Sequence, residues 1–409
     1  MNNIWTHKKE FLLGQPHAEF FSWQEKFISE IVANKSKLSD ALVEKNLSYD
    51  DLRYQFHEEI EPETPRFSFE NYELKQEKKI PVVSFFSGGG GLDLGFEKAG
   101  FDVIACIEHN ETFCKTLRRN FPEKKIFGPP DHSGDVSKVD EVISDLEQLG
   151  VKTGFNGVFI GGPPCQPFSI AANQRFNKNG ENYKRVGFSH PTNGGLLFDY
   201  VKLIEHFMPS AFLIENVPGI VELDGGEQVR SLYAILEQAG YHMASPQLLD
   251  TSEFGIPQNR KRVFIIGSRK KKVTWALEKV NKKQRSIDYL QNINENLQNT
   301  ETRLHAASSV QRYMYMAYGQ REKLGRVDRI DPYLPSKTII AGGSSGGGRS
   351  HLHPFSPRTM SVRESARLQT FPDWFVFEGP SARQFNQVGN AVPPVLAAML
   401  ANQIIQKLF

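Results

Sequence analysis

One of the three cysteines, Cys165, stands in a sequence environment suited to nucleophilic chemistry. It lies in the segment 161–169 (GGPPCQPFS), directly after an apolar run at 157–160 that we expect to be a buried strand. Three prolines stiffen this segment and would position a single thiol. A thiol of ordinary pKa is little ionised at neutral pH, so a nucleophilic cysteine needs help from its surroundings. Cys106 and Cys114 lie within apolar patterns and are instead expected to be small buried hydrophobes.

Charged residues at two other apolar runs could stabilise charge that develops during such a reaction. Glu215 lies near the end of the run at 211–217, where a buried carboxylate costs free energy unless it is exposed, paired or functional. Arg260 and Arg262 stand in the sequence PQNRKRVF at 257–264, and the alternation of a strand places them on one face. A purely structural ion pair with Glu215 is the alternative to a catalytic role.

A glycine-rich turn at 85–93 (FFSGGGGLD) joins an expected strand to an expected helix. Glycines let the backbone approach a ligand closely, and a helix N-terminus offers free N–H groups. Glu108 follows Gly88 by twenty residues and ends the next strand, where a carboxylate can accept hydrogen bonds from both ribose hydroxyls. The dehydrogenase spacing Gly-x-Gly-x-x-Gly is absent. The combination favours a nucleoside-containing cofactor over a plain strand–helix turn.

The elements that must position these residues alternate between short apolar runs and amphipathic stretches. The expected strands are 80–86, 103–108, 157–160, 211–217 and 263–267, and the expected helices are 92–99, 111–119, 196–207 and 227–238. This alternation predicts an α/β fold with a doubly wound, mostly parallel sheet and a second, smaller domain. Ligands bind such sheets beyond the carboxyl ends of the strands, where all these motifs fall.

Changes in sequence pattern divide the chain into four segments. Residues 79–270 are expected to form the large catalytic and cofactor-binding domain, and the polar, basic stretch 271–350 a smaller domain. Residues 351–409 regain helical periodicity, so we expect them to return to the large domain. Residues 1–78 are expected to be a helical N-terminal extension ending in a linker at 64–79.

The N-terminal extension offers two interpretations. Apolar residues from Phe20 to Ile31 recur at helical spacing, and two short helices are expected at 38–45 and 50–56. Ser48 and Asp51 form a capping-box pattern at the start of the second short helix. Two short helices joined by a turn leave open a helix-turn-helix DNA reader. A helical appendage packed on the main domain is the preferred interpretation.

Composition narrows the class and the location of the protein. We find no run of about 18 apolar residues and no secretory signal pattern, and there are too few cysteines for a disulfide framework. We therefore expect a cytoplasmic protein that does not span a membrane. No metal site is expected, because His351 and His353 lack Cys or acidic partners at ligand spacing. The net charge is only +2, yet 260–285 carries eleven Lys or Arg against the single acid Glu278. This run favours a phosphate-contacting strip over a merely solvated face.

A series of motifs, in this order, resembles the DNA (cytosine-5)-methyltransferase family of bacterial restriction–modification systems. The motifs are FFSGGGGLDLGF, IEHN, GDV at 134–136, GGPPCQPFS, ENV, QNRKR, RESARLQTFP at 363–372 and QVGNAVPP at 387–394. The resemblance covers about 80–409 and leaves residues 1–78 outside. It implies an S-adenosylmethionine-dependent methyltransferase fold in which 271–350 is the target-recognition domain.

The resemblance also implies a role for individual residues. Cys165 would add to C6 of cytosine, so that C5 can attack the methyl group of S-adenosylmethionine. Glu215 would engage N3 and the exocyclic amine, while Arg262, with Arg260, would hold O2 and the carboxylate. The base that removes the C5 proton is not identified. The implied cofactor-binding residues are Phe86, Gly88, Gly90, Gly91, Leu92, Glu108 (ribose), His109, Asp135 (adenine amine), Val136, Pro163, Leu196 and Asn390 (methionine end).

The expected partner is double-stranded DNA, from which the target base must be flipped because C5 and C6 are inaccessible in the stack. A basic loop at 171–185 is expected to close over the DNA. The assigned DNA contacts are Gln166, Ser169, Arg175, Lys178, Lys184 and Arg185. Base readout is expected in 271–350, although the recognised sequence is not predicted. We expect a monomer, with a cognate restriction endonuclease acting on the same site.

Two alternatives stay open at this point. One is an RNA cytosine-5 methyltransferase of the same fold, although the Cys-Phe-Thr element typical of the tRNA-modifying branch is absent from this sequence. The other is a non-catalytic DNA-binding regulator that acts through residues 1–78, for example on a restriction–modification operon.

Overall fold

A computed structural model of the chain divides into two compact units. The structure describes residues 12–72, 79–164, 195–274, 277–293, 296–324, 327–341 and 351–409, except for the side chains of 223 and 224. The larger of the two units, which we name the sheet unit, comprises Arg66–Lys283, Gln369–Gly379 and Asn390–Phe409. The other, the small unit, comprises Met1–Pro65, Gln284–Leu368 and Pro380–Gly389.

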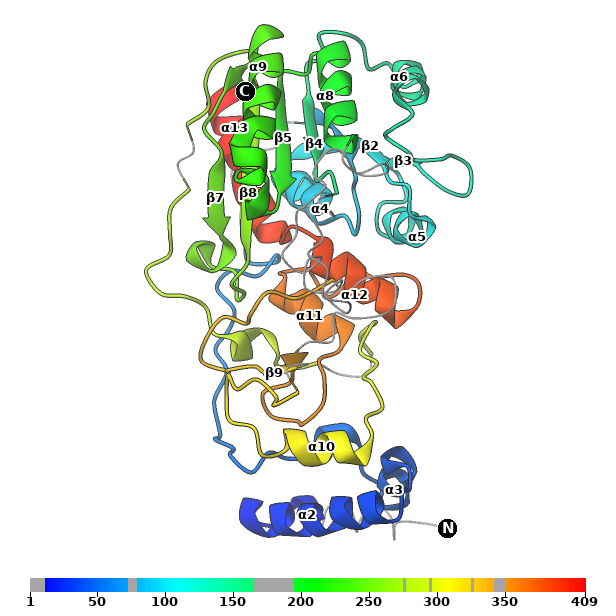
Figure 1. The fold of residues 1–409 in the computed structure, drawn as a ribbon, viewed down its shortest axis with the longest axis vertical. Helices are drawn as coiled ribbons and strands as arrows, with labels where there is room; N and C mark the ends of the chain where they lie inside the picture. Colours follow the sequence, from blue (N-terminus) through cyan, green and yellow to red (C-terminus); the bar gives the residue numbers. More distant parts are fainter. Residues whose placement is uncertain are drawn as a thin grey trace. The chain divides into compact units, whose positions relative to one another are not determined.

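The sheet unit is built on one mostly parallel sheet (Figure 1). Its strands are β1 (Ile80–Phe85), β2 (Phe101–Ile107), β3 (Lys125–Phe127), β4 (Val158–Gly161), β5 (Ala211–Asn216), β6 (His242–Met243), β7 (Gln247–Asp250) and β8 (Lys261–Ser268). Their order is β3-β2-β1-β4-β5-β8-β6, with β7 paired to β8. Strands β1 to β5 pair in parallel, whereas β8 pairs antiparallel with β5, β6 and β7. The predicted doubly wound α/β fold is confirmed.

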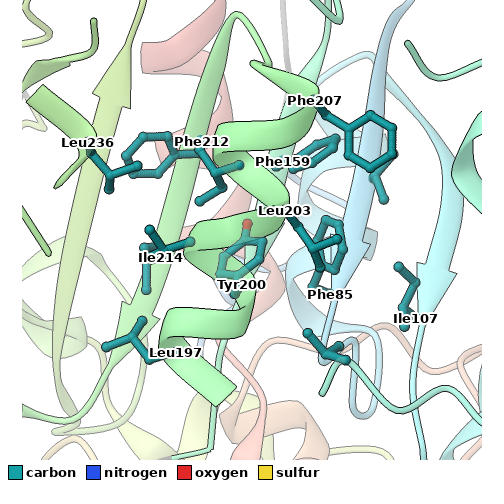
Figure 2. Close-up of a cluster of buried hydrophobic side chains, with 14 of the residues drawn as sticks. Phe85, Ile107, Phe159, Leu197, Tyr200, Leu203, Phe207, Phe212, Ile214 and Leu236 are labelled. Carbon is teal, nitrogen blue, oxygen red and sulfur yellow. The ribbon is translucent and has the colours of Figure 1, made fainter. Parts of the chain in front are cut away.

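Helices cover both faces of this sheet. On one face, α8 (Leu196–Phe207) and α9 (Glu227–Gln238) bury a large apolar core (Figure 2). There Phe85, Phe159 and Phe212, from three neighbouring strands, are fully buried beside Leu203 and Phe207 of α8. On the other face, α4 (Gly91–Lys98) packs against α13 (Pro394–Leu408). The described residues of the unit also form α5 (Glu111–Asn120) and α6 (Val139–Gln148).

The described part of the small unit contains little regular secondary structure. Its helices are α2 (His17–Ala33), α3 (Leu38–Glu44), α10 (Ala307–Tyr313), α11 (Val362–Leu368) and most of α12 (Ser381–Asn390), and β9 (Asp328–Arg329) pairs in parallel with β10 (His351–Leu352). Its interior is unusually polar, since Arg329, Arg358 and Arg363 are at most 4% exposed. Within the described residues, one stretch, Ser381–Leu408, is long and apolar enough to cross a membrane, but 78% of its apolar window is buried inside the protein.

The structure corrects two expectations about the N-terminal extension. The second short helix expected at 50–56 is wrong, because the described chain forms only a three-residue 3-10 turn, Tyr49–Asp51. The capping-box pair does form, with the Ser48 N–H donating to Asp51 across 2.8 Å. The described part of the extension packs within the small unit, against α10. A helix-turn-helix reader is therefore not formed, and the apolar face of α2 is buried by the chain itself.

The bounds of the two units also differ from those expected at the C-terminal side. We expected all of 351–409 to return to the large domain. The structure groups 351–368 and Pro380–Gly389 with the small unit, and only Gln369–Gly379 and Asn390–Phe409 with the sheet unit.

Candidate active site

The glycine-rich turn after β1 and the carboxylate after β2 are joined directly. Glu108 is buried, and its carboxylate accepts the N–H of Gly88 at 2.8 Å and the N–H of Asn110 at 2.7 Å. Phe86 and Gly88 both have positive φ angles, +54° and +58°. Such a conformation is uncommon for a phenylalanine and marks a backbone shaped for a purpose beyond the turn itself. The turn and the carboxylate thus form one preformed cradle.

A second loop, between β3 and α6, completes the surroundings of Glu108. A Cβ on Gly134 would lie 2.1 Å from the carbonyl oxygen of Glu108, so only glycine permits this approach. The next residue, Asp135, accepts hydrogen bonds from the N–H and hydroxyl of Ser137. The structure therefore brings the predicted ribose and adenine ligands, Glu108 and Asp135, to neighbouring backbone positions.

The same loop contains the only group of described residues with ligand types at metal-binding distances. Nε2 of His132 lies 3.2 Å from Glu141 and 2.5 Å from Asp145. Nδ1 of His132 accepts the N–H of Gly134 at 2.9 Å, so the ring proton is on Nε2 and points to the carboxylates. This protonation leaves no imidazole lone pair for a metal. The cluster instead ties the Gly134–Asp135 turn to α6.

The C-terminal motif QVGNAVPP meets the glycine-rich turn from the other side. A Cβ on Gly91 would lie 2.3 Å from the carbonyl oxygen of Val392. Arg260, which is 1% exposed, donates to the carbonyl oxygen of Asn390 at 3.2 Å. Asn390 is thereby held beside the start of α4, where its predicted contact with a cofactor would be made.

An ion pair stands at the end of β5. Nε of Arg262 lies 2.9 Å from Oε1 of Glu215, and both side chains are largely buried. The approach is off-axis, and Oε1 receives no well-aligned hydrogen bond from the residues that the structure describes. Oε2 lies 3.1 Å from the place where Gly162 would carry a Cβ. The carboxylate is thus paired in charge but retains hydrogen-bonding capacity towards the loop after β4.

The loop after β4 is anchored to the end of β5. Nδ2 of Asn216 donates to the carbonyl oxygen of Pro163 across 3.4 Å, a long hydrogen bond. Pro163 lies two residues before Cys165, the predicted nucleophile, which is outside the described residues. Gly162 and Pro163 nevertheless place the start of the Pro-Pro-Cys segment against Glu215 and Asn216.

Comparison with known proteins gives this arrangement a family. The C-5 cytosine-specific DNA methylase family matches residues 80–406. Similar proteins include the type II methyltransferases M.FnuDI of Fusobacterium nucleatum, 30% identical over 80% of this chain and 95% of the relative, and M.MthTI of Methanothermobacter thermautotrophicus, 32% identical over 80% and 97%. The chain belongs to the C-5 cytosine-specific DNA methylase family. It is a DNA (cytosine-5)-methyltransferase.

Solved structures agree on the fold. A DNA modification methyltransferase encoded within an E. coli prophage is 24% identical and has a TM-score of 0.64, covering 80% of this chain and 99% of its own. The Entamoeba histolytica methyltransferase EhMeth is 18% identical with a TM-score of 0.58, covering 81% and 100%. Both likenesses support the methyltransferase fold alone.

The other two cysteines of this methyltransferase are confirmed as buried. Burial raises the pKa of the Cys106 thiol well above its usual value, and its Sγ donates to Asp93 at 3.2 Å. Burial also raises the pKa of Cys114 to about 12, and its Sγ donates to the carbonyl oxygen of Glu108. Neither thiol can ionise near neutral pH, which leaves Cys165 as the candidate nucleophile of the chain.

The remaining predicted cofactor residues differ in exposure. Gly90, Leu92, Val136 and Pro163 are buried, Leu196 is half-buried at the start of α8, and the side chain of His109 is 72% exposed. A hydrogen bond with Glu108 raises the pKa of His109. The six predicted DNA contacts, Gln166, Ser169, Arg175, Lys178, Lys184 and Arg185, lie outside the described residues.

The basic run 260–285 is in part a set of structural contacts. Lys270 donates to the carbonyl oxygen of Leu408, Arg269 to that of Pro209, and Lys279 pairs with Glu253. The seven lysines of this run are nevertheless exposed, whereas its four arginines are buried or half-buried, so the lysines are the members that could contact phosphates.

Sequence reasoning missed two residues that hold the site. Asn216 was part of the quoted ENV motif but was given no role, and its position beside Glu215 at a strand end was the available signal. His132 was not singled out. Its partners Glu141 and Asp145 lie on α6, and the sequence alone does not show that this helix packs beside His132.

Proposed function

We propose that this enzyme transfers a methyl group from S-adenosylmethionine to C5 of a cytosine within a specific double-stranded DNA sequence, through a covalent bond between Cys165 and C6. The observation that carries the proposal is the juxtaposition at the ends of β4 and β5. Gly162 and Pro163 bring the segment that leads into Cys165 against the Glu215–Arg262 ion pair.

The cradle around Glu108 fits a nucleoside with an attached amino acid. Each carboxylate oxygen of Glu108 accepts one backbone N–H and can accept another donor, as binding a ribose diol requires. S-adenosylmethionine, when bound, supplies an electrophilic methyl group. Phe86, Gly88, Gly90, Gly91 and Leu92 would line its binding loop, with Asp135 at the adenine and Asn390 at the methionine end.

The chain's own residues would carry the chemistry of the base. The Cys165 thiolate adds to C6, which gives C5 the electron density to take the methyl group. A base then removes the C5 proton, the C5–C6 double bond re-forms and the thiolate leaves. Glu215 would engage N3 and the amine, since its Oε1 lacks a well-aligned donor among the described residues, while Arg262 would hold O2.

The substrate would be flipped out of the duplex, because these atoms are inaccessible within stacked bases. We assign base readout to 271–350 and closure over the DNA to the basic loop 171–185. The matched relatives are named type II methyltransferases. On that ground we propose a restriction–modification role for a monomeric cytoplasmic enzyme, with a cognate endonuclease for the same site.

Base-resolution bisulfite sequencing of host DNA after expression tests this function. The expected result is protection of one cytosine in one recurrent sequence, and loss of that protection with Cys165→Ala. Labelled methyl transfer to duplex DNA and to tRNA should be measured in parallel. Transfer to tRNA alone would replace the DNA substrate with RNA.

A further inference from the structure

Residues 12–63 lie outside the family match, which begins at residue 80. We propose that they are an integral brace of the small unit, without which this enzyme does not bind its DNA sequence, although it still binds the cofactor. The proposal rests on the proposed function in assigning DNA readout to the small unit. We name residues 12–63 the brace.

Helix α2 of the brace lies beside α10 (Figure 1), and the brace shares an apolar core with that helix. Phe20, Ile28 and Leu42 of the brace are at most 1% exposed and cluster with Val310 and Met314. The backbone N–H of Gln55 also donates to the carbonyl oxygen of Met314. A short helix such as α10, with seven residues, has little stability of its own, so this packing holds it in place.

Two buried tyrosines of the brace hold backbone segments that are distant in sequence. The Tyr49 hydroxyl donates to the carbonyl oxygen of His305 at 2.8 Å and accepts its N–H at 3.1 Å. The Tyr54 hydroxyl donates to the carbonyl oxygen of His353 at 2.9 Å. Residue 305 lies within the expected recognition segment 271–350 and residue 353 lies just after its end, so the brace holds two points of that region that are distant in sequence.

A buried arginine is enclosed between the brace and the recognition segment. The Arg329 guanidinium lies 3.5 Å from the ring centroid of Tyr54 and 4.1 Å from that of Tyr318. It donates to the carbonyl oxygens of Met316, Pro354 and Phe56. A buried cation needs hydrogen-bond acceptors and aromatic rings around it to replace water. The brace supplies the ring of Tyr54 and the carbonyl oxygen of Phe56.

A second arginine repeats this design at a different place. Arg358 pairs with Glu364 through two hydrogen bonds, of 3.0 and 2.7 Å, and with Asp50 of the brace at 2.5 Å. Gln291 and Arg285 in turn donate to the carbonyl oxygens of Glu63 and Glu61. The brace therefore contacts the unit along most of its described length, as an internal structural part does and an independent DNA-binding module does not.

The test uses the full-length chain with Tyr54→Ala, Tyr54→Phe and Val43→Ala. Tyr54→Ala removes both the ring against Arg329 and the bond to His353, and we expect the KM for duplex DNA to rise at least tenfold. Tyr54→Phe keeps the ring and should stay within about threefold of the wild type. Val43, 75% exposed on the same brace, is the control and should not change the KM. The Kd of S-adenosylmethionine, measured by calorimetry, should stay within about twofold in all three.

Hydrogen exchange gives a readout that does not depend on the substrate. In Tyr54→Ala we expect faster exchange of backbone amides at 305–330 and 351–360, with unchanged exchange in β1, β2 and β4. Unchanged exchange there, or an unchanged KM for DNA, would overturn the brace. If the variant proves globally unfolded, Tyr49→Phe removes only the hydroxyl that both donates to and accepts from the His305 backbone, and it should speed exchange in a smaller region, the amides next to residue 305; unchanged exchange there would then overturn the brace. A wild-type enzyme that methylates no DNA, with the exchange pattern as expected, would refute the proposed function and leave the brace standing.

Discussion

The two units of this methyltransferase are stabilised in opposite ways. In the sheet unit, apolar side chains such as Phe85, Phe159 and Phe212 fill the space between strands and helices, and the site is shaped by backbone close contacts at glycines. In the small unit, buried arginines and tyrosines bind carbonyl oxygens of segments with little secondary structure. The close contacts at glycines in the sheet unit leave little room for other side chains, which suits a site that performs one fixed reaction. The buried polar side chains of the small unit hold irregular loops through their backbone, so this support does not depend on which side chains the loops expose.

Arg329→Ala should have the largest effect on stability, and it should destabilise the small unit without destabilising the sheet unit. Removing this guanidinium leaves the buried carbonyl oxygens of Met316 and Pro354 without donors, at a cost of about 3–5 kcal/mol to the small unit. Denaturant-dependent hydrogen exchange should show this loss in the small unit and not in the sheet. Arg230→Ala, at an exposed arginine that donates to Gly225, is the matched control. Equal losses in both units would mean that they unfold as one.

Gly91→Ala should damage the sheet unit by a steric route. The added Cβ would lie 2.3 Å from the carbonyl oxygen of Val392, and such overpacking costs about 1–3 kcal/mol. We expect cofactor affinity to fall at least tenfold by calorimetry. Gly150→Ala, where a Cβ meets open space but φ is +84°, should weaken stability slightly and leave cofactor affinity intact. Normal affinity in Gly91→Ala would show that the C-terminal motif does not shape the cradle.

Glu108→Gln should act on the cofactor more than on DNA. The amide cannot replace a carboxylate that accepts the Gly88 and Asn110 N–H groups and the ribose together, so the cofactor KM should rise roughly 10- to 100-fold. The kcat at saturating cofactor should change little. Glu111→Gln, a largely exposed neighbour, is the control. A fall in kcat with an unchanged cofactor KM would contradict the assignment of Glu108.

Acid should weaken the small unit before the sheet unit. Burial lowers the pKa of both His351 and His353 to about 4. The unfolded chain takes up these protons near pH 6.5 and the folded chain only near 4, so stability falls as the pH drops through this window. We expect a loss of about 1 kcal/mol per histidine between pH 7 and 5.5. The pKa of Glu364, lowered to about 2 chiefly by Arg358 against the opposing effect of burial, adds a further loss below pH 4.5.

Thermal unfolding of the wild type and of His351→Gln/His353→Gln at pH 7 and 5.5 measures this effect. The double variant should lose less stability on acidification than the wild type. An identical pH dependence of the two proteins would assign acid sensitivity to other groups.

Much of the sheet unit could be predicted from the sequence, because strand and helix periods are local signals. Helices α8 and α9 have the expected bounds. The small unit could not be predicted in this way. Its order depends on contacts such as Tyr49 with His305, which are 256 residues apart, and no periodicity signals them. The absence of the expected helix at 50–56 has the same cause. Tyr54 packs against Arg329 and Asp50 pairs with Arg358, and both contacts are distant in sequence.

Covalent trapping on a duplex with 5-fluorocytosine at the target position tests the reaction most directly, because C5 then carries no removable proton. With S-adenosylmethionine present, we predict a stable protein–DNA adduct whose mass-spectrometric cross-link maps to Cys165. Cys114→Ser, which keeps the hydrogen bond to Glu108 at a thiol that cannot ionise, should trap as the wild type does. An adduct at another residue, or full methylation of ordinary DNA by Cys165→Ala, would contradict the account.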